Sequence, residues 1–264
     1  MDSVLFYQLS PVIAALVFFL IVLLFHWLGH KYRHFRSGRF PAEKKTGLGV
    51  AEGSLIGLTA LLLAFSFGMT ASKFEKRREI IVEEANAIGT AILRCDLYPD
   101  SIRMAFLKDF GQYIDERIAY YDAGDVPQKI AASLENASRI SDRIWKRAVR
   151  VSRNREDPAQ SILMISALNS MIDLASTRDA SREFVVPRII QWILILMMLL
   201  SGFLAGYDAD WERKNLALLL SFSLMTSLSF YLIMELDRPR KGYINLGSAE
   251  QHIVDLKKMV GEAR

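Results

Sequence analysis

The fold is decided by residues Gly49 to Arg94, which read GVAEGSLIGLTALLLAFSFGMTASKFEKRREIIVEEANAIGTAILR. The part from Gly53 to Ser72 carries no charge, and it is about as long as the 20 residues that a helix needs to cross a bilayer. Charged residues begin at Lys73, but no proline occurs before Pro99. This pattern predicts one long helix that leaves the membrane without a break and continues into a soluble domain.

Small residues recur every three or four positions along the uncharged part and therefore share one face of the helix. They are Gly53, Gly57, Ala60, Ala64, Gly68 and Ser72. Small side chains let another helix approach closely in lipid. We expect this face to contact other helices.

A second stripe of the same helix is polar. It consists of Glu52, Thr59, Ser66, Thr70, Lys73 and Arg77. Polar groups inside a membrane face protein or water, so the stripe predicts either the lining of a water-filled path or polar bonds between helices. Three bulky side chains lie within about one step of the stripe and are candidates for an apolar constriction: Leu62, Phe65 and Met69. Lys73, Arg77 and Arg78 would favour anions at the mouth of such a path.

Beyond the membrane, the same helix carries polar residues at helical spacing, namely Glu79, Glu83, Asn86, Thr90 and Arg94, with Glu84 beside them. The pattern predicts bonding between helices or subunits rather than a pair of catalytic carboxylates. The sequence has no Ser/His/Asp set, phosphate-binding glycine loop or Cys/His cluster. We therefore expect no enzyme activity, no cofactor and no metal site.

Three further uncharged runs predict membrane spans: Val4 to Trp27, Ile189 to Tyr207 and Asn215 to Met234. His26, His30 and His34 lie at helical spacing at the exit of the first run. A metal site there is the weaker interpretation, because no carboxylate or cysteine completes a ligand set; contact with lipid head groups is the stronger one. A basic connector, residues 29–48, leads to the second span.

The whole pattern predicts an all-α integral membrane protein with four transmembrane helices and a helical soluble insert between the second and third. The expected parts are residues 1–72, 73–184, 185–236 and an amphipathic tail, 237–264. In that tail we place Ile253, Leu256 and Val260 on the apolar side and Glu250 on the polar side. The net charge of +4 is spread along the chain, which predicts no nucleic-acid partner, and charges in the insert nearly balance.

Several segments resemble two known families. The segment FSFGMTASKFEKRREIIVEEANAIG resembles the end of the pore helix of bestrophins, with Phe74, Arg77 and Glu79 as loose counterparts. The runs LLLAFSF, VEEANAIGTAILR, LNSMIDL (168–174) and LDRPRKG (236–242) are similar to the bestrophin-like family of bacterial membrane proteins. Through these runs, Asn169, Asp173, Asp237 and Arg238 join the expected polar motif between helices.

The resemblance implies a homo-oligomer, most simply a pentamer, that conducts ions with a leaning towards anions along the 53–94 helix. It also implies a multi-pass protein of the cell inner membrane, in contact with lipid, with the insert in the cytoplasm. The basic first connector favours the opposite orientation by the positive-inside rule, so both orientations stay open. The alternative from the sequence is a non-conducting, membrane-anchored sensor or scaffold whose insert binds a partner protein.

Overall fold

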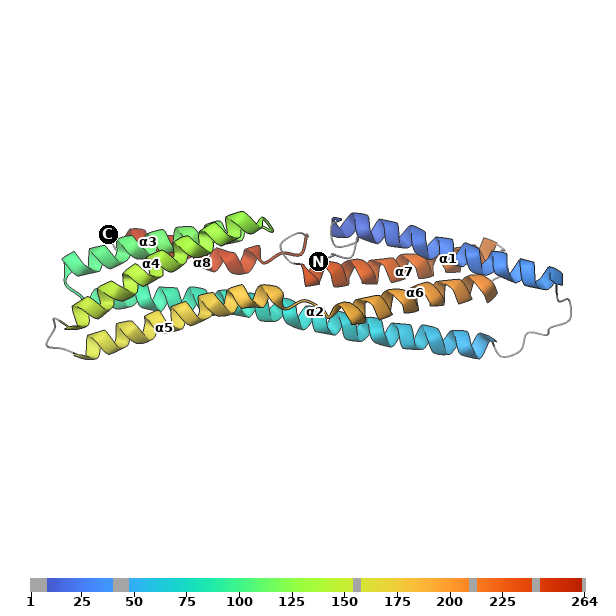
Figure 1. Ribbon diagram of the computed structural model, residues 1–264, viewed down its shortest axis with the longest axis horizontal. Helices are drawn as coiled ribbons and strands as arrows, with labels where there is room; N and C mark the ends of the chain where they lie inside the picture. Colours follow the sequence, from blue (N-terminus) through green and yellow to red (C-terminus); the bar gives the residue numbers. More distant parts are fainter. Residues whose placement is uncertain (1–8, 40–47, 154–157, 209–212, 239–242, 263–264) are drawn as a thin grey trace. The chain divides into compact units, whose positions relative to one another are not determined.

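The computed structural model describes residues 9–39, 48–153, 158–208, 213–238 and 243–262, and every regular element in these ranges is a helix (Figure 1). The long helix α2 runs from Leu48 to Leu93. The prediction of a helix that continues unbroken out of the membrane is therefore confirmed. A short 3-10 turn, η2 (Arg94–Leu97), follows it.

Four helical segments are long and apolar enough to cross a membrane, as predicted. They lie in α1 (Pro11–Arg39), in the first part of α2, in α6 (Arg188–Asp208) and in α7 (Arg213–Asp237). The soluble helices are α3 (Asp100–Asp122), α4 (Pro127–Arg153), α5 (Pro158–Ala180) and α8 (Gly247–Glu262), with a 3-10 turn, η3 (Ser181–Glu183), after α5.

The chain folds as two units. The first contains residues 1–73 and 185–244, and the second contains residues 74–184 and 245–264. The tail that the sequence set apart as 237–264 is thus divided, because α7 ends at Asp237 while α8 packs in the second unit. Helix α2 contributes its apolar part to the first unit and its charged part to the second.

In the first unit, the interior lies between α1, α6 and α7. Phe18 and Phe230 stack with ring centroids 4.5 Å apart, next to buried Val22 and Met198. Helices α1 and α6 touch backbone to backbone: a Cβ added to Gly29 would overlap the carbonyl of Phe203. We expected Gly29 to begin a connector, but α1 continues to Arg39. Gly29 therefore lies within the helix, where its lack of a side chain allows α1 to approach α6 closely.

In the second unit, α2, α3, α4, α5 and α8 share one apolar core. Its members include Ile88, Phe110, Ile144, Met171 and Ile253. The helix boundaries follow from local sequence. The turn after α3 contains Gly124, whose φ of 55° suits glycine, and Pro127 and Pro158 each open a helix.

Candidate functional site on the long helix

The polar stripe of α2 faces the interior of its own chain. In the first unit, Thr59, Ser66 and Thr70 are buried. The Thr59 hydroxyl lies 2.9 Å from the hydroxyl of Ser201 on α6, and the Thr70 hydroxyl donates to the carbonyl of Ser66 on its own helix at 3.0 Å. Thr59 thus makes the polar bond between helices that the sequence left open as an alternative.

A lumen between neighbouring chains is lined by side chains that a single chain leaves exposed. Thr59, Ser66 and Thr70 are buried within their own chain, which favours the second alternative for the stripe, polar bonds between helices. Sequence periodicity could not decide this, because both stripes of α2 have the same helical period.

Arg77 continues the inward face of α2 into the second unit. It is buried, and its guanidinium donates to the carbonyls of Ser181 at 3.2 Å and Phe184 at 2.7 Å. A cation suits these carbonyls, because the last carbonyls of a helix have no partner within it. Arg77 thus binds the end of η3.

The opposite face of α2 carries the small residues, and all six of them are exposed. Apart from the adjacent residues and the helix's own backbone, no atom of the described residues lies within 4 Å of the position where a Cβ would stand on Gly53, Gly57 or Gly68. Leu58, Leu61 and Phe65 are exposed beside them, Phe65 to 63%. This uncharged face is open in the single chain.

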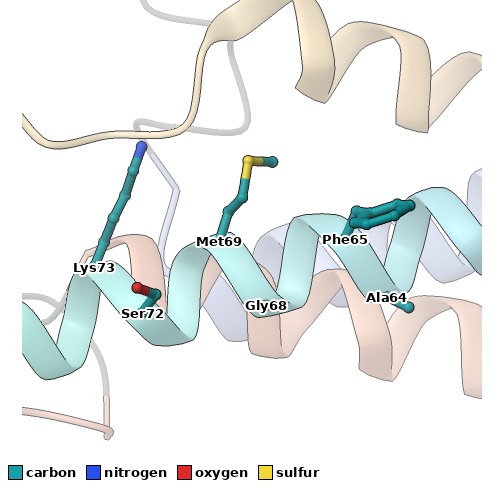
Figure 2. A pocket seen from close by; sticks show the side chains of 6 residues that line it. All are labelled: Ala64, Phe65, Gly68, Met69, Ser72 and Lys73. Carbon is teal, nitrogen blue, oxygen red and sulfur yellow. The ribbon is translucent and has the colours of Figure 1, made fainter.

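Phe65 and Met69 line a shallow hollow of about 440 Å³ at the end of this face, together with Ala64, Gly68, Ser72 and Lys73. Figure 2 shows Phe65, Met69 and Lys73 extending to the same side of α2. The Lys73 ammonium donates to the carbonyl of Val185 at 2.6 Å. Leu62 instead packs against the interior of the first unit, and Glu52 is half-buried.

Glu84 is the centre of a buried charge network in the second unit. Its carboxylate pairs with the guanidinium of Arg117 on α3 at 2.6 Å and with that of Arg178 on α5 at 2.8 Å. Arg178 also donates to Glu250 on α8. Two carboxylates and two guanidiniums therefore join four helices with no net charge.

Tyr120 completes this network. The guanidinium carbons of Arg117 and Arg178 lie 4.8 and 5.1 Å from the centre of its ring, and its hydroxyl donates to Asp179 at 3.2 Å. Burial opposes the charge on Arg117, but the carboxylate of Glu84, together with Tyr113 and Tyr120, outweighs burial and raises the pKa of Arg117. Burial raises the pKa of Tyr113 beside it. Arg117 therefore stays charged while Tyr113 stays neutral.

Sequence analysis missed Arg117, Arg178 and Glu250. A signal was present for Arg117, because it falls one turn after Tyr113 within the apolar stripe of α3, where a charge needs a buried partner. Glu250 was expected on the polar side of the tail but is buried, since Arg178 lies within reach of it. No local pattern reveals that contact.

The remaining residues of the expected polar motif differ in their surroundings. Arg94 donates to the carbonyl of Leu163 on α5, and Asp237 accepts from the backbone N–H of Val186 at 3.0 Å. Glu79 pairs on the surface with Lys76, and Arg238 is half-buried. The others are exposed: Glu83, Asn86, Thr90, Asn169 and Asp173.

The three histidines of α1 do not converge. His26 is buried, with Nδ1 3.2 Å from the hydroxyl of Ser223 on α7, while the rings of His30 and His34 lie edge to face with centroids 4.4 Å apart. Within the described ranges, no three His, Cys, Asp or Glu side chains are grouped so that they could hold a metal ion.

This architecture defines an all-helical integral membrane protein with a helical soluble unit. The family model of the bestrophin-like domain matches residues 14–249. The chain therefore belongs to the bestrophin-like family.

Solved structures give the same fold. A bacterial bestrophin homologue from Klebsiella pneumoniae, in a tryptophan-to-alanine variant, has a TM-score of 0.73 at 13% identity, covering 94% of this chain and 98% of that one. A second structure of a bestrophin homologue from the same organism has a TM-score of 0.69 at 14% identity, covering 92% of this chain and 98% of that one. No curated protein matches this chain.

Proposed function

We propose that the protein is an oligomeric membrane channel that conducts ions passively along the exposed face of α2. The observation that carries this proposal is the open, uncharged face of small residues on a helix that crosses the membrane. Such a face suits close approach by helices of neighbouring chains. Membership of the bestrophin-like family supports the same function.

The proposed assembly is a homo-oligomer in which copies of α2 surround a central axis. Most homo-oligomers of soluble proteins have closed point-group symmetry, and the resemblance to bestrophins implies five copies around one axis. We place this assembly in the inner membrane, with lipid around it and the soluble unit in the cytoplasm.

The narrow point of the proposed path is formed by apolar side chains. Phe65 is the principal candidate, because it is the more exposed of the two phenylalanines beside the small-residue face, and Met69 follows it one turn later. Leu61 and Leu58 lie one and two turns earlier, respectively, on the same exposed side. Rings of such side chains can stop ion flow by excluding water.

The proposed leaning towards anions depends on Lys73. Its hydrogen-bond partner is a neutral carbonyl, so its positive charge is not cancelled by that contact. Lys76 and Arg78 follow on the exposed side of α2, but each is paired with a carboxylate, Glu79 and Glu75 respectively. Lys73 is therefore the cation that contributes most to the local potential.

The test is flux from liposomes that contain the purified protein. A gradient of chloride and, separately, of potassium is imposed, and flux is compared with protein-free liposomes. Faster chloride release from the protein-containing liposomes is the expected result. If neither ion moves faster than in the protein-free control, the protein is not an open channel, and the scaffold alternative takes its place.

A further inference from the structure

Helix α4 collects basic residues on one face, although charges in the insert as a whole nearly balance. Five of them follow a strict alternation of four and three residues, and Arg147 lies beside them: Arg139, Arg143, Lys146, Arg150 and Arg153. That alternation averages 3.5 residues, so the five side chains form a straight seam along the helix. We call these six residues the basic seam.

The basic seam is largely exposed, and a buried carboxylate of α3 binds two of its arginines. Lys146 is 69% exposed and Arg143 48%, and Arg139, Arg150 and Arg153 are exposed too. Asp109 of α3 is buried and holds two of the guanidiniums, with one carboxylate oxygen 2.9 Å from Arg143 Nε and the other 2.7 Å from Arg147 Nη2. The buried carboxylate thus orients two arginines on the surface.

The seam carries excess positive charge. Apart from Asp109, the carboxylate that pairs with it among the described residues is Asp142, 2.6 Å from Lys146. Six cations against two carboxylates leave a surplus of four. The seam extends over about 21 Å of helix, at 1.5 Å per residue.

The chemistry of the seam restricts its partner. Within α4 the structure exposes no large apolar side chain. Insertion into a lipid surface relies on exposed apolar groups, and single-stranded nucleic acids stack on aromatic rings. Arginines instead bind carboxylates through two parallel hydrogen bonds, and a 3.5-residue repeat matches the carboxylate spacing of a helix lying alongside.

We propose that the basic seam of α4 is a docking surface for an acidic helical segment of a partner protein, with carboxylates three and four residues apart. The surface lies entirely within the second unit. It requires neither ion conduction nor a particular number of subunits.

The test measures binding of synthetic peptides to the purified full chain in detergent by fluorescence anisotropy. The probe is a helical peptide of about 20 residues with glutamates at alternating four- and three-residue spacing. Its control has the same composition in scrambled order. We expect the patterned peptide to bind more tightly than the scrambled one, and its affinity to fall as salt is raised past about 0.15 M, where surface charges are screened.

The matched variants remove equal charge at different places. The seam variant carries Arg139→Gln, Lys146→Gln, Arg150→Gln and Arg153→Gln; the control variant carries Lys76→Gln, Arg78→Gln, Lys129→Gln and Lys258→Gln, all exposed positions. We expect the seam variant to weaken patterned-peptide binding by about tenfold or more, given several lost ion pairs, and the control variant to bind as the parent does.

A charge exchange keeps the test decisive even if the seam variant folds poorly. Arg150→Glu alone should weaken binding of the patterned peptide, and replacing one glutamate of the peptide by lysine should restore it. Equal binding of patterned and scrambled peptides, or equal loss in both variants, would overturn the proposal. It would also be overturned if polyphosphate or phosphatidylglycerol vesicles bind through the seam while the patterned peptide does not.

Discussion

The Oε1 atom of Glu84 lies 2.6 Å from Nε of Arg117, and their side chains are 0% and 1% exposed. Removing one partner of such a pair leaves the other charge buried and uncompensated. We therefore expect Glu84→Gln to destabilise the second unit by about 3–5 kcal/mol. Thermal unfolding of the full chain in detergent, followed by circular dichroism, measures this change.

The matched control is Glu79→Gln, on the exposed side of the same helix. Glu79 makes a surface pair with Lys76, and such pairs contribute little to stability, so the unfolding temperature should stay close to that of the parent. If Glu84→Gln unfolds at the same temperature as Glu79→Gln, the buried network does not stabilise the unit as described.

Glu250 ties α8 to the rest of the second unit through Arg178. Glu250→Ala removes the ion pair between α8 and Arg178. Helix α8 is then held less tightly, so its backbone amides should be less protected from exchange. Hydrogen exchange of residues 247–262 should become faster, while exchange in α3 changes less. Asp255→Asn, which alters a carboxylate on the surface of the same helix, is the control and should leave exchange unchanged.

Phe65 is the residue through which we expect the channel to narrow. Phe65→Ala should widen and wet the constriction and raise single-channel conductance severalfold. Met225→Ala removes a similarly exposed apolar side chain from α7 and should leave conductance unchanged. Leu58 is not a suitable control, because it lies two turns from Phe65 on the same exposed side. An unaltered conductance in Phe65→Ala places the constriction elsewhere.

Lys73 and Arg77 should respond differently to substitution, although both are basic and one turn apart. Lys73→Glu should move the reversal potential in a salt gradient towards that of a cation-conducting pore. Arg77→Gln should instead lower the yield of folded protein, because Arg77 bonds the carbonyls of Ser181 and Phe184. Lys258→Glu, at an exposed position of α8, is the control for charge alone. Lys73 is not on the path if its charge reversal leaves the reversal potential unmoved while flux persists.

Two kinds of glycine in the first unit should also behave differently. A Cβ on Gly206 would overlap the backbone of His26, so Gly206→Ala should destabilise the fold by roughly 1–3 kcal/mol, the usual cost of overpacking. Gly57 and Gly68 have open space in the single chain. Gly57→Leu with Gly68→Leu should leave each chain folded but disrupt the assembly, which mass measurement in mild detergent detects. An intact oligomer in that double variant would falsify the small-residue interface.

Much of the fold could be predicted because its signals are local. An uncharged run of sufficient length predicts a span wherever it occurs, and the absence of proline between Gly49 and Pro99 predicts that α2 continues. Pro127 and Pro158 begin helices because proline suits the first helical position. These features depend on residues close together in the chain, so the sequence by itself determined them.

The inward face of α2 was decided only by the tertiary structure. Its two stripes share one period, and in lipid the difference between a polar face and a small-residue face does not fix which one packs inward. Glu84, Arg117, Arg178 and Glu250 come from four helices far apart in sequence, and their pairing depends on how those helices pack. The spacing of the basic seam on α4 can be read from the sequence. Its exposure depends on the tertiary structure, because the opposite face of α4 is buried in the core of the second unit.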